Sequence, residues 1–341
     1  MTKLGNCEIL KNLKSILPVF VILIILVTGF FFLKRKTAAP VEHTFLYFDT
    51  FVNVKFYSEK GTNTKSIIDA VDKELERIDS LYGYGKGSLV NDLRFGSRLK
   101  ITSEESYILS ESHFVSNITD GAFDITVGAL ENVWGFRGNN PHLPLKKDIE
   151  QALSETGYEN INLQDSTVSL LSDNVIVDLG GISKGYAVDR ATEMLKKQGI
   201  KAGIVDAGGD LRVFGKNPDG EKWTIGIRNP DRLSAIIKRF SIDEGAVATS
   251  GNYERYFLEN GKKYHHILNP ETGYPANKCV SVTIIAPEAI LADAIATGVF
   301  VMGPQKGMKL IETMSKVEGV IMYKEDGNLK IANSEGILLR E

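Results

Sequence analysis

Hydrophobic and polar positions follow two different periods in the first part of the chain. At 51–57, Val52, Val54 and Phe56 alternate with polar residues, which is typical of a half-buried strand. At 65–81, apolar residues recur every three to four positions, which predicts an amphipathic helix. The pair Thr102/Glu105 has the spacing of a capping box, so we expect another helix from there to about residue 117.

The second half of the chain mixes the two patterns. A helix is predicted from about Ser183 to Gln198, where Gly199 is the expected stop, and another after Pro287. Strands are predicted at 169–177, 202–206, 223–227, 235–242, 264–268 and 280–286, and a last helix at about 305–317 precedes a hairpin-like end. Because strands and helices do not alternate strictly, we predict an α+β fold with mixed or antiparallel sheets and packed helices, rather than a doubly wound α/β fold.

One segment lies outside these patterns. Ile16–Leu33 is an uncharged run, and as a helix it would be about 27 Å long, close to the hydrocarbon thickness of a bilayer. We predict a transmembrane signal anchor at 16–33 after a short N-terminal segment at 1–15. A cleaved signal peptide and a buried core helix are the alternatives. A linker at 34–43 and one folded domain at 44–341 complete the expected organisation.

Charge is distributed unevenly between these parts. Residues 1–40 hold six Lys/Arg and one acid, a charge of +5, so with a chain total of −3 the remaining residues carry −8. An acidic body binds polyanions poorly, so nucleic acid is not an expected partner. A bound nucleotide would need a divalent cation or backbone amides opposite its phosphates. The cysteines, Cys7 and Cys279, lie on either side of the predicted anchor, which excludes a disulfide framework and a zinc site.

The segment Asp178–Asp189 places glycines between a predicted strand and a predicted helix. Gly180 and Gly181 can present backbone N–H groups to an anion, as phosphate-binding loops do. The spacing is neither that of a Walker A loop nor that of a dinucleotide-binding fingerprint, and a Gly-Gly turn can equally be structural. Lys184 favours the functional interpretation, because a lysine in the first helical turn opposes the helix dipole unless an anion lies nearby.

Asp293 and Thr297 are four residues apart on the helix predicted after Pro287, so their oxygens face the same side. A carboxylate and a hydroxyl on an alanine-lined face form half of a site for Mg²⁺, which takes oxygen ligands and keeps some waters. The alternative is that Asp293 only caps or solvates its helix. The adjacent His265 and His266 point to opposite sides of a strand, so one of them beside a ligand is more plausible than a joint metal site.

Taken in chain order, these segments resemble the ApbE family, the FAD:protein FMN transferases, from about Tyr47 to Gly303. Seven motifs in one order are a specific signal. The motifs are F-D-T-F (48–51), G-A-F-D-I-T-V (121–127), D-L-G-G-I-S-K-G-Y-A-V-D (178–189), A-G-G-D-L-R (207–212), A-V-A-T-S-G (246–251), H-H-I-L-N-P-E-T-G (265–273) and A-D-A-I-A-T-G (292–298).

The resemblance implies a set of site residues. Mg²⁺ would be held by the Asp293 carboxylate, the Thr297 hydroxyl and the backbone carbonyl of Gly181. Asp293 would be catalytic through the metal, and His266 would assist proton transfer. The flavin nucleotide would contact Phe48, Tyr84, Ala122, Phe123, Asp124, Asp178, Lys184 and Ile267.

Three positions depart from the family pattern. Phe48 stands where methionine is common, Asp206 where asparagine is frequent and Gly181 where alanine is frequent. The first two leave the shape of the FAD pocket open, whereas a backbone ligand tolerates the change at Gly181. The expected class of reaction is unaffected.

The resemblance also implies a reaction and a location. FMN would move from FAD to a threonine hydroxyl of an acceptor protein through a phosphodiester bond, with Mg²⁺ bound and AMP released. The acceptor would carry an S/T-G-A-T-type site and belong to a membrane redox complex or be an extracellular electron-transfer protein. The catalytic domain would face the extracytoplasmic side of the cytoplasmic membrane, held by the single-pass anchor.

Three other functions stay open on the sequence. With water as the nucleophile, the same site would be an FAD pyrophosphatase that yields FMN and AMP. Without turnover, it would be a flavin-binding protein. Self-flavinylation at 241–251 is the third, because S-I-D-E-G-A-V-A-T-S-G faintly matches an acceptor site, although Glu244 and Val247 replace its hydroxyl residues.

Overall fold

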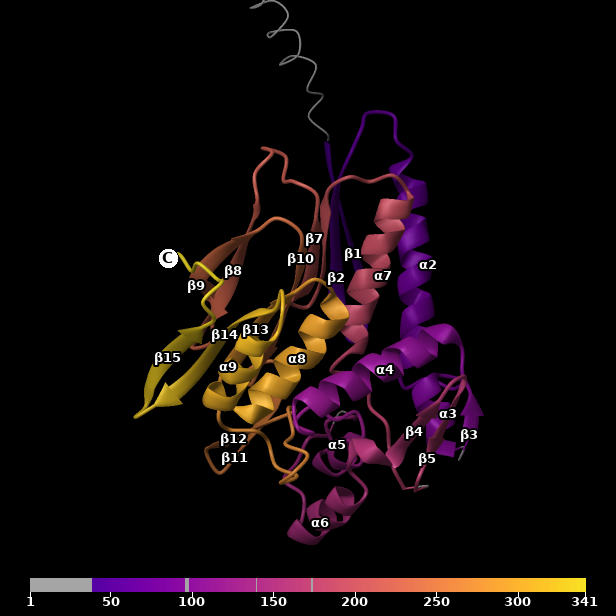
Figure 1. Ribbon diagram of the computed structural model, residues 1–341, viewed down its shortest axis with the longest axis vertical. Helices are drawn as coiled ribbons and strands as arrows, with labels where there is room; N and C mark the ends of the chain where they lie inside the picture. Colours follow the sequence, from indigo (N-terminus) through magenta and orange to yellow (C-terminus); the bar gives the residue numbers. More distant parts are fainter. Residues whose placement is uncertain (1–38, 96–97, 139, 173) are drawn as a thin grey trace, which may run out of the picture. The chain divides into compact units, whose positions relative to one another are not determined.

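The central element is an eight-stranded sheet that does not follow chain order (Figure 1). The computed structural model describes residues 39–95, 98–138, 140–172 and 174–341, of which 40–57 and 63–341 form one compact unit. The ladders from β2 to β15 are antiparallel. In spatial order the strands are β1 (Ala39–Tyr47), β2 (Thr50–Ser58), β6 (Gly203–Ala207), β7 (Asp210–Phe214), β10 (Gly245–Gly251), β13 (Ser281–Ala286), β14 (Glu318–Glu325) and β15 (Asn328–Asn333).

Helices cover one face of this sheet, and α2, α7 and α8 are the three that carry or adjoin the site residues. Helix α7 contacts α2 and α8, and α8 in turn contacts α9 (Figure 1). The helices of the described part are α2 (Thr64–Tyr82), α3 (Leu89–Phe95), α4 (Ser103–Ile118), α5 (Gly128–Trp134), α6 (Lys146–Ser154), α7 (Ser183–Lys197), α8 (Ala289–Met302) and α9 (Pro304–Thr313).

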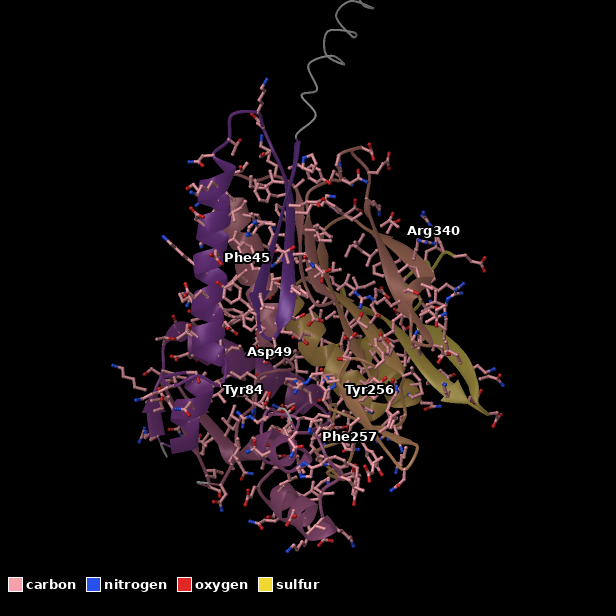
Figure 2. The ribbon with its side chains drawn as sticks, turned by 180° about the vertical axis from the view of Figure 1, so that it is seen from behind. Phe45, Asp49, Tyr84, Tyr256, Phe257 and Arg340 are labelled. Atoms are coloured by element: carbon pink, nitrogen blue, oxygen red, sulfur yellow. The ribbon has the colours of Figure 1, made fainter. Side chains whose placement is uncertain are left out.

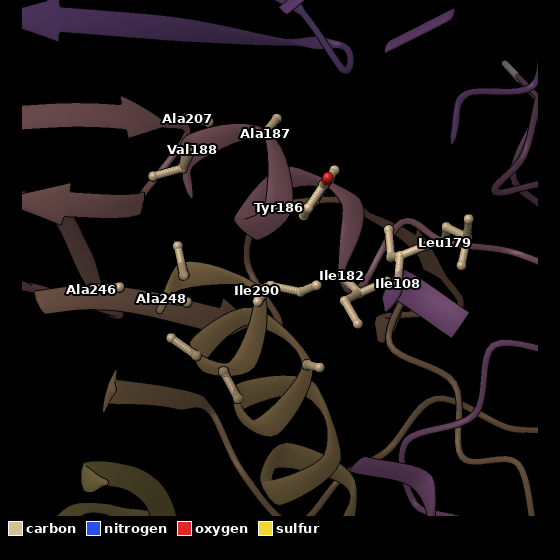
Figure 3. Close-up of a cluster of buried hydrophobic side chains, with 14 of the residues drawn as sticks. Ile108, Leu179, Ile182, Tyr186, Ala187, Val188, Ala207, Ala246, Ala248 and Ile290 are labelled. Atoms are coloured by element: carbon tan, nitrogen blue, oxygen red, sulfur yellow. The ribbon is translucent and has the colours of Figure 1, made fainter. Parts of the chain in front are cut away.

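Alternation along the central strands builds a core on each face of the sheet. In β10, Ala246 and Ala248 belong to the core under the helices, whereas Val247 belongs to the core under the ribbon of β8 (Trp223–Asn229) and β9 (Arg232–Ile242). The alanines lie in one cluster with Ala187 of α7 and Ile290 of α8 (Figure 3). Small side chains on the sheet therefore let α7 and α8 pack closely against it.

A third cluster surrounds Trp134 at the end of α5. The Trp134 indole N–H donates to the Gly273 carbonyl at 2.8 Å, and its ring lies 5.5 Å from that of Tyr264. These contacts join α5 to the hairpin of β11 (Tyr256–Glu259) and β12 (Lys262–His265). A separate small sheet contains β3 (Arg98–Lys100), β5 (Thr167–Leu170) and β4 (Ile161–Gln164) in that order.

The α+β prediction and most of the predicted elements are confirmed. Helix α4 begins with the expected capping box, and α7 and α2 have nearly the predicted bounds. The predicted strand at 169–177 is wrong after Leu170, because the chain turns away and Ile176 forms only an isolated parallel bridge with Val127. The strand at 264–268 is also displaced: β12 ends at His265, and the Ile267 carbonyl instead accepts the Ala276 N–H. Helices α3, α5 and α6 were not predicted.

The N-terminal predictions fall mostly outside what the structure describes. The segment at 1–15 and the anchor at 16–33 lie outside the described residues. From residue 39 onward, apart from the gaps at 96–97, 139 and 173, no helix is both long enough and apolar enough to span a bilayer. Strand β1 begins at Ala39, inside the range that was assigned to a linker.

Candidate active site

Helices α7 and α8 meet at a glycine, and this contact places the predicted metal ligand. A Cβ on Gly185 would lie 2.2 Å from the Ala289 carbonyl oxygen and 2.9 Å from the Asp293 Cβ. The Gly185 N–H donates to Asp293 Oδ2 at 3.0 Å. The Asp293 carboxylate therefore lies at the N-terminus of α7, where the helix dipole favours an anion.

Asp189, the last residue of the Asp178–Asp189 motif, fastens the same two helices. Its carboxylate accepts the N–H groups of Ala289 and Ile290, both at 2.9 Å, and so caps the start of α8 from α7. Arg212 of β7 donates to the same carboxylate at 2.7 Å. No role was predicted for Asp189 from the sequence, and the structure shows that it holds α8, and with it Asp293, in place relative to α7.

Lys184 joins two buried carboxylates. Its Nζ lies 2.6 Å from Asp210 Oδ2 and 3.3 Å from Asp293 Oδ2, and Asp210 and Asp293 are 5% and 4% exposed. Burial acts to lower the pKa of Lys184, but the charges of Asp210 and Asp293 outweigh it and hold the pKa above its usual value. The anion that Lys184 was expected to need is thus present within the protein.

Burial also changes the acidity of Asp293. Burial first, and then the charge of Asp210, raises the pKa of Asp293 to about 7, while Lys184 and the Gly185 N–H oppose the rise. A carboxyl poised in this way binds a cation readily, because a second positive charge would relieve its repulsion from Asp210. Asp210 itself was not assigned a role, although its motif A-G-G-D-L-R was among those recognised.

Thr297 lies one helical turn after Asp293 on α8, and Gly181 lies close to Thr297. The Thr297 Oγ1 is 3.1 Å from Ser250 Oγ of β10. A Cβ on Gly181 would lie 3.5 Å from Thr297 Oγ1 and 3.2 Å from the Phe123 ring. Among the described residues, no group of three or more His, Cys, Asp or Glu could hold a metal. This donor set fits Mg²⁺ nonetheless, because that ion commonly takes one or two carboxylates and completes its shell with waters and substrate phosphates.

Asp178 is surrounded by hydrogen-bond donors. Its Oδ1 accepts the Gly180 N–H at 2.7 Å, its Oδ2 accepts the Tyr84 hydroxyl, and Arg137 Nε lies 3.7 Å from Oδ2. Burial acts to raise the pKa of Asp178, but hydrogen bonds from Glu131, Tyr84 and Gly180 hold it below its usual value. Because Asp178 occupies the Gly180 N–H, that group is not one of the phosphate donors expected from the glycine pair.

Phe48 and Tyr84 are both tied to the C-terminal end of α2. The Phe48 N–H donates to Asp79 Oδ1 at 3.2 Å, and the Gly83 N–H donates to the Asp79 carbonyl at 2.9 Å. Phe48 and Asp49 form the two-residue turn of the β1–β2 hairpin with φ of 55° and 54°, a conformation that is unfavourable for a phenylalanine. Figure 2 labels Asp49 in this turn and Tyr84 just beyond α2.

Asp124 faces a different space from that of Lys184. Its Oδ1 accepts the Thr126 N–H at 2.7 Å and the Thr126 hydroxyl at 2.6 Å, and burial raises its pKa to about 6. It lines a recess of about 400 Å³ with Gly121 and Tyr158, and neither Lys184 nor Asp293 lines that recess. The other members of the predicted flavin set in this segment, Ala122 and Phe123, are part of the packed core or its margin.

The backbone joins the segment around Asp124 to the segment around Asp178. The Asp178 N–H donates to the Ile125 carbonyl at 2.6 Å, and the Gly128 N–H donates to the Ile176 carbonyl at 3.1 Å. Two motifs that are far apart in the sequence are therefore neighbours. The structure brings together Tyr84 with Asp178, and Gly181, Lys184, Asp293 and Thr297 with one another.

The two histidines have different surroundings. His265 is buried, with Nε2 2.7 Å from the Ala276 carbonyl and Nδ1 accepting the Ile267 N–H at 3.3 Å, so both ring nitrogens are occupied. His266 is partly exposed, and its Nδ1 lies 3.2 Å from the Arg255 carbonyl. That contact requires the proton on Nδ1 and leaves the Nε2 lone pair free. Burial, then the charge of Arg255, lowers the pKa of His266 to about 3, so the ring is neutral at physiological pH. Of the pair, only His266 has a ring nitrogen, Nε2, that the described contacts leave open.

Glu131 and Arg137 beside Asp178 had no signal in the sequence. They lie in the stretch Gly121–Gly138, which shows neither period, and their proximity to Asp178 arises only through the fold. Ile267, predicted to contact flavin, is buried in the core next to His265.

Comparison with known proteins places this geometry in a family. The chain matches the ApbE family over residues 48–321. It is 32% identical to an FAD:protein FMN transferase of Vibrio cholerae serotype O1 over 310 residues, covering 88% of this chain and 92% of that protein. It is also 32% identical to the protein of that name from Escherichia coli K12, covering 75% of each.

Solved structures agree with this match. The crystal structure of an ApbE protein from Thermotoga maritima has a TM-score of 0.80 at 36% identity, covering 87% of this chain and 97% of that one. A structure described as flavin transferase ApbE from Vibrio cholerae has a TM-score of 0.80 at 30% identity, covering 87% and 98%. The chain therefore belongs to the ApbE family of transferase enzymes.

Proposed function

We propose that this chain moves FMN from FAD onto a threonine hydroxyl of an acceptor protein, with Mg²⁺ bound, and releases AMP. The observation that carries the proposal is the convergence at the start of α7 of the Lys184 ammonium, the Asp210 and Asp293 carboxylates and the nearby Thr297 hydroxyl. The names of the relatives, which the chain matches over most of its length, support the same reaction.

Asp293, Thr297 and the Gly181 carbonyl are the groups that we expect to hold Mg²⁺. The ion would supply Lewis-acid charge at the phosphate oxygens of the substrate. The Asp293 carboxylate is already held in position to bind the ion. The Gly185 N–H orients its Oδ2, and the Asp189 side chain caps the helix α8 that carries it.

Lys184 would bind phosphate oxygens directly. Its side chain is 29% exposed while its carboxylate partners lie behind it, so part of the ammonium is accessible to a ligand. An ammonium has three N–H donors, and beyond the two carboxylates Lys184 Nζ reaches only the Gly180 carbonyl, at a long 3.5 Å. A phosphate oxygen could replace that weak contact. The positive charge would position the phosphates and stabilise the charge that develops on the departing AMP.

The flavin part would lie toward Tyr84 and Asp178. An aromatic hydroxyl, a charged carboxylate and the strained turn at Phe48 meet there around the end of α2. Ala122, Phe123, Asp124 and Ile267 are expected to complete this side. The segment 249–251 of β10 would form part of the wall of the FAD pocket. Thr249 holds this segment in the sheet, because its N–H donates to Asp210 and its hydroxyl pairs with Thr283.

His266 is our candidate for the base. The acceptor threonine oxygen would attack the FMN-side phosphorus of FAD while its proton passes to His266 Nε2. The bond between that phosphorus and the bridging oxygen would break, and AMP would leave with the electron pair. One P–O bond forms and one breaks, so no oxidant or reductant is needed.

The location and partner belong to the same proposal. We expect the 16–33 segment to anchor the chain in the cytoplasmic membrane, with the catalytic domain on the extracytoplasmic side. The acceptor would carry an S/T-G-A-T-type site, in a membrane redox complex or an extracellular electron-transfer protein. The acidic body supports a protein acceptor rather than nucleic acid.

The test mixes the full-length chain with FAD, Mg²⁺ and a purified acceptor domain that carries such a site. An acceptor mass gain equal to FMN, with equal AMP release and dependence on Mg²⁺, is the expected result. Free FMN and AMP with an unmodified acceptor would instead mean a pyrophosphatase, and FAD binding without AMP would mean a flavin-binding protein. Mass gain of the chain itself would reveal self-flavinylation.

Asp293→Ala tests the assigned site in that assay. We expect transfer to fall at least 100-fold while the fold is kept, since the variant loses the proposed metal ligand. Asp69→Ala, on the exposed side of α2, is the matched control and should be fully active. An active Asp293→Ala variant would remove the metal assignment.

A further inference from the structure

Two ion pairs join helix α7 to strand β7, and their charges run in opposite directions. Lys184 Nζ of α7 lies 2.6 Å from Asp210 Oδ2 of β7. In the second pair the acid is on α7, and Arg212 Nη1 of β7 lies 2.7 Å from Asp189 Oδ1. The α7 members are separated by about 7.5 Å along the helix and the β7 members by about 6.6 Å along the strand. Both pairs can therefore form together, and sliding α7 along β7 by one pair would bring like charges into contact.

Helix α8 is held by one member of each pair. The Asp293 carboxylate lies 3.3 Å from Lys184 Nζ, and the first two N–H groups of α8 donate to Asp189, both at 2.9 Å. Among the described contacts, Glu288, the N-cap residue of α8, makes no side-chain capping hydrogen bond of its own. The start of α8 therefore depends on the Asp189 carboxylate for its cap, and Asp293 lies on the turn that follows.

Arg212 supplies the charge that allows Asp189 to be buried. Asp189 is 7% exposed, and a carboxylate buried to this extent carries a large desolvation cost unless a cation lies beside it. The Arg212 side chain is itself 12% exposed, and its Nε has no hydrogen-bond partner among the described residues. A buried guanidinium with an unpaired N–H adds little to the stability of the fold. This arrangement favours a role for Arg212 in holding Asp189 in place over a role in stability.

We propose that Arg212 is a positioning residue of the metal site: it holds the Asp189 carboxylate against the N-terminus of α8, and so holds Asp293 where it can bind Mg²⁺. The inference rests on the proposed function, in which Asp293 is a ligand of that ion. Without Arg212, Asp189 would lose its counter-charge and turn toward the recess of about 460 Å³ that it lines with Arg190 and Glu288. The first turn of α8 would then lose its cap, and Asp293 would lose its fixed place.

A purely structural role for Arg212 makes a different prediction. If the pair only stabilises the packing of α7 against β7, the loss of Arg212 should lower the midpoint of urea unfolding and leave the affinity of the folded protein for a divalent cation unchanged. If Arg212 acts through Asp189, the folded protein should bind the cation more weakly. Substitutions at both positions should then have no greater effect than one, because each breaks the same series of contacts.

The experiment uses Mn²⁺ as a paramagnetic probe of the Mg²⁺ site and measures its Kd from the EPR signal of the free ion, with the full-length chain and FAD but no acceptor. We expect Arg212→Met and Asp189→Asn each to weaken Mn²⁺ binding about tenfold, as the loss of a group that orients a metal ligand usually does. The double variant should lie within about twofold of either. The Kd of FAD without metal, from flavin fluorescence, should be unchanged in all three. Arg190→Met is the matched control, because this arginine of α7 pairs with Glu74 instead, and it should bind Mn²⁺ like wild type.

The outcomes separate this inference from the proposed function. Wild-type affinity for Mn²⁺ in Arg212→Met, or an equal loss in Arg190→Met, would overturn the positioning role while the metal site itself stands. A double variant about tenfold weaker than Asp189→Asn would also overturn it, because Arg212 would then act independently of Asp189. No Mn²⁺ binding by wild type would overturn the metal assignment and this inference with it.

Mn²⁺ binding that depends on Arg212, in a chain that transfers no FMN to an acceptor, would support the inference and reject the proposed reaction. If Arg212→Met does not fold, the comparison of Asp189→Asn with the double variant decides, because the double variant leaves neither member of the pair buried without its partner. Equal Kd values of Mn²⁺ in these two proteins, both weaker than wild type, are the expected result.

Discussion

At the scale of single residues, the role of Lys184 depends on the two acidic side chains beside it. It is the cation between Asp210 and Asp293, and the site would otherwise hold two buried carboxylates without a counter-charge. We expect Lys184→Met to lower the rate of FMN transfer by about 100- to 1000-fold, the usual effect of removing one group that stabilises transition-state charge. AMP release under saturating FAD and Mg²⁺ is the measurement.

The control for this substitution is Lys65→Met, since Lys65 is exposed at the start of α2. It should leave the rate unchanged. Urea unfolding should also show Lys184→Met to be less stable than wild type, because Asp210 and Asp293 then repel each other without compensation. A Lys184→Met enzyme with wild-type turnover would show that Lys184 serves only to neutralise the carboxylates.

His265 makes the stability of the protein depend on pH. Burial, outweighing the Ala276 carbonyl, lowers the pKa of His265 from 6.5 to about 4. The folded state therefore takes up this proton less readily than the unfolded state, and stability that is complete above about pH 6.5 is lost as pH falls toward 4. The loss of stability from this group is about 3 kcal/mol.

Urea unfolding of wild type and His265→Gln at pH 7 and pH 4 measures that loss. Wild type should lose about 3 kcal/mol more than the variant over this interval, because glutamine has no proton to take up. His266, whose pKa is also lowered, contributes to both proteins and cancels in the difference. Equal losses in the two proteins would contradict the assignment.

The sequence predicted those site residues that are related by local geometry or by a motif. Asp293 and Thr297 share a face because they are four residues apart on one helix. His265 and His266 differ in their surroundings as expected, but not through strand alternation, because β12 ends at His265. The proximity of Glu131 to Asp178 has no such local origin, because it arises where α5 packs beside the 176–178 segment. Site residues that are brought together only by the packing of distant segments cannot be predicted from local sequence patterns.

At the scale of elements, the decisive contact is the crossing of α7 and α8 at Gly185. We expect Gly185→Ala to push these helices apart, because the new Cβ would overlap the Ala289 carbonyl and the Asp293 Cβ at 2.2 and 2.9 Å. The Gly185 N–H would then no longer orient Asp293. The variant should lose at least tenfold in transfer rate and about 1 to 3 kcal/mol in stability, the usual cost of overpacking.

Gly138→Ala is the matched control, because nothing lies within 4 Å of a Cβ at that position. It should leave both the rate and the midpoint of urea unfolding unchanged. If Gly185→Ala behaves like this control, the helices have room that the structure does not show, and the contact does not place Asp293.

Element ends were harder to predict than element centres. The capping box of α4 and the glycine after α7 are local signals, and both ends were found. The end of β12 depends on the hydrogen bond from the Ala276 N–H of a neighbouring loop to the Ile267 carbonyl. No local sequence pattern predicts this contact. The short helix α5 is likewise stabilised by Trp134 packing against the β11–β12 hairpin rather than by periodicity.

At the scale of the whole molecule, strand order was the least predictable feature. Strand β2 pairs with β6, from which it is separated along the chain by the ten described elements from α2 to α7. Strand β7 pairs with β10, although β8 and β9 lie between them in the sequence. Alternation within a strand predicts which side chains face a core but not which strand lies beside it. The mixed order of strand and helix patterns was enough to predict the fold class, whereas the strand pairings come from long-range contacts.

The last prediction concerns how the whole chain is held in the cell. Ile16–Leu33 precedes an acidic body, whose net negative charge opposes binding to an anionic lipid surface, so we expect membrane attachment to depend on this run. We expect full-length protein to stay in the membrane pellet after carbonate extraction. Leu23→Arg/Leu26→Arg should move it to the supernatant, because each arginine costs about 2.5 to 3.5 kcal/mol at the centre of a bilayer. Leu23→Ile/Leu26→Ile keeps the apolar length and should remain in the pellet. Recovery of the full-length chain in the supernatant would reject the anchor, and recovery of a shortened chain there would mean a cleaved signal peptide.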